Sequence, residues 1–381
     1  METTYGRDRQ LYSINERYKI IDREKLLETG SITFIEECGI KYQEIKINLN
    51  HHFQFKHTKK KYANTLTVYA GNDGIGNLIP NSKEEADKRL DLALDILKEE
   101  YGIELHKNDL VPTESEININ IELDKPYSMY SADLLPALLK SAVNNRSKKN
   151  KKKKPIEIDG YFAFDNDCIK LKIYNKKQDL LENKKKKGVT DTIYNYISPY
   201  KDIIRFEIVY KKSNSKIENA TIDELMDEEI KAEIYKEMFL PYLKDLRKRQ
   251  GLLKKQITYI SGNFTKKKKK DLVRHILSYK THAGNIDVLD VVEILYCFHK
   301  NNKYKNDETS IKSLSIVYQE LSTEKINDGT NTIGIERYLG VNGLLLELIN
   351  KLQLQEKDEY IELLEDMENF FRKILKFTEN I

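Results

Sequence analysis

Three segments of the chain alternate strictly between apolar and polar residues, and this alternation constrains the fold more than any other feature. In residues 116–123 every odd position is aliphatic and every even position is polar. Residues 170–174 and 205–208 also alternate between polar and apolar side chains, with the apolar ones at odd positions in the first segment and at even positions in the second. Because successive side chains of a strand point to opposite faces, each segment predicts a strand with one buried and one polar face. Such strands are typical of an antiparallel sheet.

Other segments predict the elements around these strands. Ser82 and Glu85 have the spacing of a capping box, and apolar residues at helical spacing follow until Gly102, which predicts a helix over 82–102. A second helix is expected over 131–144. The remaining predicted strands cover residues 44–55, 65–70, 168–176 and 203–210.

The pattern changes after residue 210. A long helical stretch is expected over 221–249, and the last segment places apolar residues at helical spacing over 360–375. We therefore predict an α+β domain over residues 1–215, an antiparallel sheet with helices on one face, followed by an all-α domain over 216–381. No fixed-period repeat is visible.

The charge of the chain is unevenly distributed. Its 65 basic and 61 acidic residues give a net charge of +4, but residues 140–187 hold 16 basic and 6 acidic residues, a local charge of +10. Clustered cations suit a polyanion, because phosphates that they neutralise release counterions. The alternative is that abundant lysine merely forms solvated loops. Further basic runs occur at Lys59–Lys61, Arg247–Arg249 and Lys266–Lys270.

The sequence also excludes several classes of protein. No window approaches 18 uncharged apolar residues, and the first residues have neither a basic nor an apolar signal region, so we expect a cytoplasmic protein without a membrane partner. Cys38, Cys168 and Cys297 are too far apart to predict a zinc module or a disulfide framework.

The polar face of the predicted sheet carries side chains that could take part in catalysis. It combines a tyrosine with lysines, an arginine, carboxylates and amides, which suits a tyrosine nucleophile, a hard divalent cation and a stabilised phosphoryl transition state. DNA nicking through a phosphotyrosine would use all three. An ordinary solvent-facing sheet would also have a polar face, so the pattern alone leaves both interpretations open.

Two motifs resemble a known family. Residues 168–176, Cys-Ile-Lys-Leu-Lys-Ile-Tyr-Asn-Lys, are followed about thirty residues later by Ile-Arg-Phe-Glu at 204–207. This order is similar to that of the replication initiators of filamentous phages and related plasmids, the gene II/X family, with residues 116–123 at the position of an acidic or amide-bearing strand. The resemblance covers roughly residues 40–215.

The resemblance implies a nickase-like domain that cuts one strand at a replication origin, keeps the 5′ phosphate on a tyrosine and leaves a 3′ hydroxyl. Tyr174 matches the family nucleophile and Lys176 the lysine that accompanies it. Single-stranded and duplex origin DNA are the implied substrates, with a host helicase or polymerase as a further partner. On the same face we expect ligands for Mg²⁺ or Mn²⁺ at Glu116, Asn118 and Glu207, and DNA contacts at Lys170, Lys172 and Arg205.

Some residues depart from the wider nickase pattern. His51 and His52 are adjacent, so on a strand they point to opposite faces and cannot chelate one metal as a pair; at most one histidine, such as His57, would join carboxylates. Tyr196 and Tyr210 are the next candidates for the nucleophile. The C-terminal helices are expected to bind duplex DNA or a partner protein, with Lys266–Lys270 at the start of a basic helix.

Two other functions fit the same sequence. One is a DNA-binding regulator of a mobile element that uses the same scaffold without catalysis. The other is an interaction protein whose lysine runs reflect composition alone. Retention of a covalent DNA adduct would separate the initiator from both.

Overall fold

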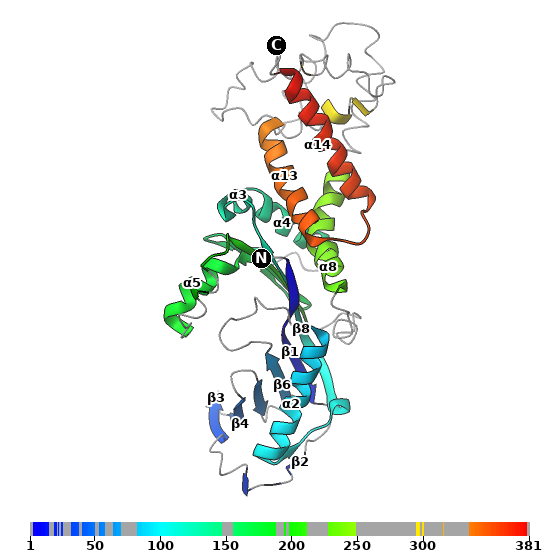
Figure 1. The fold of residues 1–381 in the computed structure, drawn as a ribbon. Coiled ribbons are helices and arrows are strands. Elements are labelled where there is room, and N and C mark those ends of the chain that lie inside the picture. Colours follow the sequence, from blue (N-terminus) through cyan, green and yellow to red (C-terminus); the bar gives the residue numbers. More distant parts are fainter. Residues whose placement is uncertain are drawn as a thin grey trace. The chain divides into compact units, whose positions relative to one another are not determined.

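The structure is a computed structural model, and it divides into two compact units, Met1–Met238 and Phe239–Ile381 (Figure 1). The predicted domain boundary at residue 215 precedes this division. The residues that the structure describes are 3–14, 19–20, 22, 24–25, 32–37, 40–49, 53–57, 64–69, 82–146, 155–187, 194–195, 198–211, 228–248, 295–297, 299–300, 315 and 335–378.

Within these residues the first unit contains a sheet of ten strands, and every pair of neighbours is antiparallel. The spatial order is β3-β4-β5-β6-β1-β8-β12-β11-β10-β9. The predicted α+β class with an antiparallel sheet is therefore confirmed. The bounds are β1 Thr4–Ile14, β3 Ile32–Glu37, β4 Ile40–Leu49, β5 Phe53–His57, β6 Asn64–Tyr69, β8 Leu110–Glu122, β9 Ile156–Ile158, β10 Tyr161–Asp165, β11 Ile169–Asn175 and β12 Ile203–Lys211. A separate short pair joins β2 (Lys19–Ile20) to β7 (Ile103–Glu104).

The apolar face of β8, β12 and β11 forms the core of this unit. Ile117 lies opposite Ile208, and Ile119 lies opposite Phe206, so the aliphatic positions of neighbouring strands meet on one face, and all four are buried. Helix α4 (Leu134–Arg146), which follows α3 (Tyr127–Ser131), contacts β10 and β11. Burial of these apolar side chains is the main source of the unit's stability.

Helix α8 (Glu229–Ile234) also belongs to the first unit. It contacts β1, β8 and β12, and its residues Ile230 and Ile234 are fully buried. Tyr210 has the parity of the apolar face, and its hydroxyl donates to Glu233 of α8 at 2.6 Å. Helix α8 therefore packs on the apolar face, and the sheet unit extends beyond the last strand.

The helix predicted over 82–102 is confirmed as α2 (Lys83–Tyr101). Ser82 Oγ accepts from the Glu85 backbone N–H, and the Glu85 side chain accepts from the Ser82 backbone N–H, which completes a capping box. Gly102 ends the helix with φ of 63°. An added Cβ there would lie 2.5 Å from the Asp22 carbonyl oxygen, so glycine is required.

Two of the predicted strands differ from the structure. Residues 44–55 were expected to form one strand, but β4 ends at Leu49 and β5 begins at Phe53, and the two pair as neighbours. The sequence alternation ends at that point, because His51 follows Asn50 where an apolar residue would continue it. Lys176 was expected on the strand of Tyr174, but β11 ends at Asn175 and Lys176 begins α5 (Lys176–Lys187).

The second unit is helical where it is described. The helix that starts with α8 passes through a π-helical turn, η2 (Tyr235–Phe239), and continues to residue 248. Helix α13 (Ile335–Leu352) contacts α14 (Glu359–Thr378), and α14 confirms the helix predicted over 360–375. Lys266–Lys270 lie outside the described residues.

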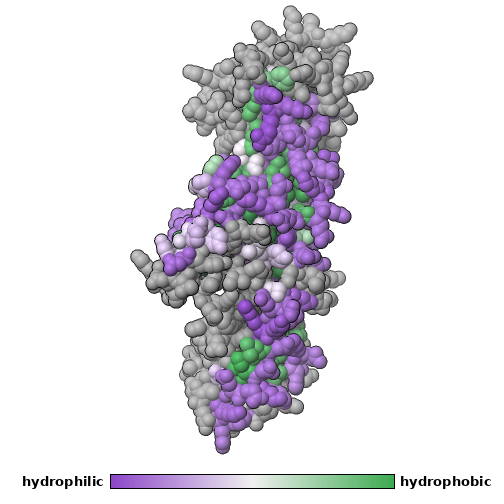
Figure 2. All heavy atoms as spheres, viewed as in Figure 1, coloured by the Kyte–Doolittle hydropathy of each residue, from purple (hydrophilic) through white to green (hydrophobic). Residues whose placement is uncertain are grey.

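Among the described residues, no helix is both long enough and apolar enough to cross a bilayer. On the face drawn in Figure 2, hydrophilic residues cover most of the described surface, and hydrophobic residues occupy smaller areas between them.

Candidate functional site: a buried tyrosine–carboxylate–cation cluster

The polar positions of β8, β12 and β11 meet on the face opposite the core. Strand β12 lies between β8 and β11, although it follows both in the sequence. The register therefore creates two cross-strand rows, Asn118–Glu207–Lys172 and Asn120–Arg205–Tyr174. Residues directly opposite each other on an antiparallel sheet have side chains close enough to interact. The register thus confirms that these six residues share the polar face predicted from their alternation.

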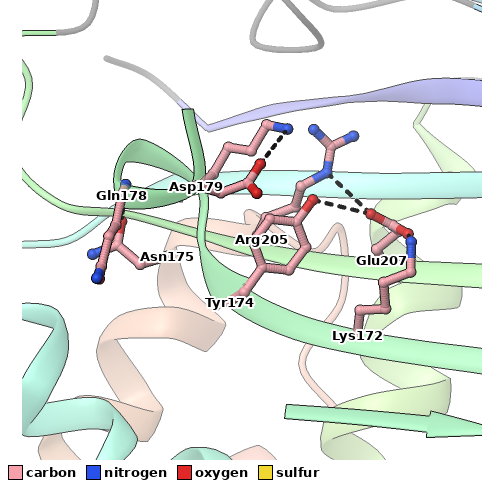
Figure 3. Close-up of polar contacts among 8 residues, drawn as sticks. Lys172, Tyr174, Asn175, Gln178, Asp179, Arg205 and Glu207 are labelled. Atoms are coloured by element: carbon pink, nitrogen blue, oxygen red, sulfur yellow. Dashed lines mark hydrogen bonds and ion pairs between the residues drawn. The ribbon is translucent and has the colours of Figure 1, made fainter. Parts of the chain in front are cut away.

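Glu207 is the centre of this face (Figure 3). The Tyr174 hydroxyl donates to Glu207 Oε2 at 3.1 Å, and Arg205 Nε lies 3.7 Å from the same oxygen. Lys172 Nζ forms an ion pair with Glu207 Oε1. The carboxylate therefore receives a phenol proton donor and two cations from the two strands β11 and β12.

The charged centre of the cluster is buried, whereas Tyr174 and Lys172 are half-buried. Arg205 is 0% exposed and Glu207 is 2% exposed, although both occupy the polar face. Burying a charge is costly unless it is paired, so Lys172 and Arg205 compensate the charge of Glu207. A tyrosine whose hydroxyl donates to a carboxylate in such surroundings has the arrangement of a nucleophile next to a proton acceptor.

The position of Lys176 follows from the end of β11. Asn175 Oδ1 accepts from the backbone N–H of Gln178 at 3.1 Å, which caps α5 and ends the strand. Lys176 is buried, its Nζ lies 3.5 Å from Asp179 Oδ2, and it lies 5.7 Å from the centroid of the Tyr174 ring. Lys176 therefore remains beside Tyr174, but from a helix start and not from the strand.

A second tyrosine, which the sequence did not single out, contacts Tyr174. The ring centroids of Tyr161 on β10 and Tyr174 on β11 are 5.6 Å apart with a tilt of 40°. Burial raises the pKa of Tyr161, and the negative charges of Asp179, Glu116 and Asp165 raise it further. A raised pKa makes the Tyr161 hydroxyl harder to deprotonate than that of an ordinary tyrosine, which disfavours it as a nucleophile.

The predicted metal ligands lie on two neighbouring strands. Glu116 and Asn118 alternate on β8, and Asn118 lies opposite Glu207. The described residues contain no group of three His, Cys, Asp or Glu side chains that could hold a metal by themselves. Mg²⁺, however, is commonly bound by one or two carboxylates together with substrate phosphates and water.

Asn118 gives a further indication of a ligand. Its side chain is 1% exposed, and its Nδ2 has no hydrogen-bond acceptor among the described residues. The nitrogen and oxygen of an amide are interchangeable by rotation, so this buried position can present an oxygen. Glu116 and Asn118 therefore fit a hard cation, whereas Glu207 already interacts with Tyr174, Lys172 and Arg205.

The remaining candidates are distributed as follows. Lys170 is half-buried on β11, on the same face, opposite Asp165 of β10. Tyr210 is buried on the apolar face and binds Glu233, so it does not share the site of Tyr174. His51, His52 and Tyr196 lie outside the described residues, and His57 ends β5.

Comparisons with known proteins add no relative. No family model matches the chain, and neither a curated protein nor a solved structure shows significant similarity to it. The chemistry of the site therefore follows from its own residues and from the two motifs at 168–176 and 204–207.

Proposed function

We propose that the chain is a replication initiator of a phage or plasmid, a nickase that cuts one strand of origin DNA through Tyr174. The observation that carries the proposal is the hydrogen bond of 3.1 Å from the Tyr174 hydroxyl to Glu207, a carboxylate held by Lys172 and Arg205. The Tyr-x-Lys and Arg-Phe-Glu motifs of the resemblance contain Tyr174, Arg205 and Glu207. The protein would act on origin DNA in the cytoplasm together with a host helicase or polymerase.

The reaction consists of one transesterification. The Tyr174 oxygen attacks the scissile phosphorus while its proton passes to Glu207, and the bond from phosphorus to the 3′ oxygen of the preceding nucleotide breaks. That oxygen becomes a 3′ hydroxyl by taking up, through a water molecule, the proton that Glu207 then releases, and the 5′ phosphate stays on Tyr174. Attack of a 3′ hydroxyl on the phosphotyrosine reverses the step and closes the strand.

The cations around Glu207 have two functions in this reaction. Before the reaction, Lys172 and Arg205 hold the carboxylate in place to accept the Tyr174 hydrogen bond. As the proton moves to Glu207, their charge becomes available to the phosphate oxygens, where negative charge develops. Lys170, on the strand of Tyr174, would contact an adjacent phosphate, and Lys176 would contribute its positive charge beside the Tyr174 ring.

A divalent cation would complete this site. Glu116 and Asn118 would hold Mg²⁺ or Mn²⁺ together with phosphate oxygens of the DNA and water, while Glu207 stays paired with Lys172 and Arg205. When bound, the ion would neutralise charge on the transferred phosphate.

A labelled-adduct assay tests the proposal. The full-length protein is incubated with single-stranded fragments that cover its own gene and the flanking DNA, labelled at either the 3′ or the 5′ end, and then denatured. A 5′-phosphotyrosine retains the downstream strand, so the 3′ label should remain on the protein and the 5′ label should not. Tyr174→Phe should bind the same DNA without forming an adduct.

The possible outcomes separate the candidate functions. Binding without any adduct would favour the non-catalytic regulator. An adduct that persists in Tyr174→Phe would show that another residue is the nucleophile.

A further inference from the structure

The hairpin formed by β9 and β10 presents apolar side chains next to Tyr174. Its two-residue turn has positive φ at both positions, 47° at Asp159 and 77° at Gly160, which matches the twist of a tight hairpin. The hydroxyl of Tyr127 donates to the Gly160 carbonyl oxygen at 2.6 Å. The hairpin is therefore held to the body of the first unit at its tip.

Three large side chains of this hairpin are exposed. Ile156 is 50% exposed, Ile158 is 60% exposed and Tyr161 is 36% exposed. Ile158 lies opposite Tyr161, and Ile156 lies opposite Ala163, which in turn lies opposite Lys172. All three side chains therefore share the face of Lys172 and Tyr174, and we call them the hairpin platform.

An exposed apolar group on an edge strand is unusual, because it favours association. The surroundings of the platform indicate the kind of ligand. Asp165 and Asp179 lie close enough to Tyr161 to raise its pKa, and such negative charge would repel a phosphate from the ring. Lys170 and Lys172 lie on the next strand, β11. The geometry favours a ligand that places a flat neutral group on the hairpin and its phosphates along β11.

We propose that the hairpin platform stacks an unpaired base of single-stranded DNA next to the scissile phosphate. This inference rests on the proposed nicking function and specifies its substrate. The Tyr161 ring lies 5.6 Å from the Tyr174 ring, so a base stacked on Tyr161 would belong to a nucleotide close to the scissile phosphate. Aromatic rings bind unpaired bases with little sequence preference, whereas the base faces of a duplex are already stacked.

The test uses the full-length Tyr174→Phe protein, so that binding is measured without cleavage. The probe is a single-stranded oligothymidylate that contains one 2-aminopurine, whose fluorescence reports stacking. Tyr161→Ala should weaken binding of this probe by roughly 5- to 150-fold, the usual effect of losing one stacked base, and should remove the fluorescence change. Tyr161→Phe should retain both, and affinity for a duplex of the same length should stay unchanged.

Tyr194→Ala is the matched control, since Tyr194 is also an exposed tyrosine, at 44%, but lies outside the hairpin. Equal losses of single-strand and duplex affinity in Tyr161→Ala, or an unchanged 2-aminopurine signal, would overturn the proposal. So would a protein that dimerises through the hairpin and becomes monomeric in Ile158→Lys, because a second copy would then occupy the platform.

The wild-type protein separates this proposal from the nicking function. If wild type forms no adduct but Tyr161→Ala still loses the stacking signal, the platform is supported and the nickase is overturned. If wild type forms the adduct and Tyr161→Ala binds and cleaves equally well, the platform alone is overturned.

Discussion

Replacing Glu207 with Gln keeps the size of the side chain and removes the charge that Lys172 and Arg205 share. Breaking a buried ion pair from one side costs about 3–5 kcal/mol, because the remaining charge stays in the interior. The Arg205 side chain is 0% exposed, but that of Lys172 is 17% exposed and can reach water. We therefore expect the lower end of the range, about 3 kcal/mol. For a unit of this size that lowers the Tm by roughly 6–12 °C.

The same substitution should affect cleavage more strongly than stability. Glutamine cannot accept the Tyr174 proton, and loss of a general base reduces rates by about 10²–10⁴-fold. Adduct formation is measured below the Tm of both proteins, and thermal unfolding is followed by circular dichroism. Asp91→Asn is the matched control, because Asp91 is a 55% exposed carboxylate on α2 paired with Lys107, and such pairs contribute about 1 kcal/mol or less.

Two results would refute this reasoning. Wild-type cleavage by Glu207→Gln would show that the carboxylate neither accepts the proton nor positions the tyrosine. An unchanged Tm would show that Glu207 is not the counter-charge of the buried arginine.

Three further predictions concern the metal and the fold. Excess EDTA should abolish adduct formation and Mg²⁺ or Mn²⁺ should restore it, and full activity in the chelator would contradict a metal at Glu116 and Asn118. Ile234→Ala should lower the free energy of unfolding by about 2–5 kcal/mol, because Ile234 is fully buried in α8; a change below 1 kcal/mol would mean that α8 is not part of the first unit's core. Gly160→Ala should cost about 1–3 kcal/mol, since φ is 77° and the new Cβ would lie 3.2 Å from the Tyr127 ring, and an unaffected Tm would argue against this turn.

The alternating strands were predictable because one face is apolar and the other polar, which leaves a clear period of two even where both faces are buried. β8, β11 and β12 were all found in this way, and so was the side of the sheet to which each polar residue belongs. Parity, however, does not give strand order. Strand β12 enters between β8 and β11, and only that order places Glu207 between Asn118 and Lys172. The hydrogen bond from Tyr174 to Glu207 therefore could not be predicted from the sequence.

Other elements gave weaker signals. Residues 6–10 of β1, Gly-Arg-Asp-Arg-Gln, contain no apolar residue, so no alternation reveals the strand that pairs with β8. Arg7 is nevertheless buried there, which no propensity would suggest. The β9–β10 hairpin did carry a signal, since Asp159-Gly160 between Ile158 and Tyr161 is a favoured two-residue turn. This turn predicts a hairpin whose second strand begins with Tyr161.

The buried cluster itself allows a final prediction, on whether it serves the fold or the chemistry. Replacing a buried ionic group by apolar residues of similar volume is often neutral or stabilises a protein by about 1–4 kcal/mol. The triple variant Lys172→Met, Arg205→Met and Glu207→Leu should therefore fold with a Tm at or above that of wild type, unlike Glu207→Gln, which leaves charges unpaired. It should form no adduct, because Tyr174 keeps its ring but loses its proton acceptor and the cations beside it. Thermal unfolding and the labelled-adduct assay measure both properties on the same preparation. A triple variant that is much less stable than wild type would mean that these three residues hold the sheet together, and their burial would then no longer favour a catalytic role.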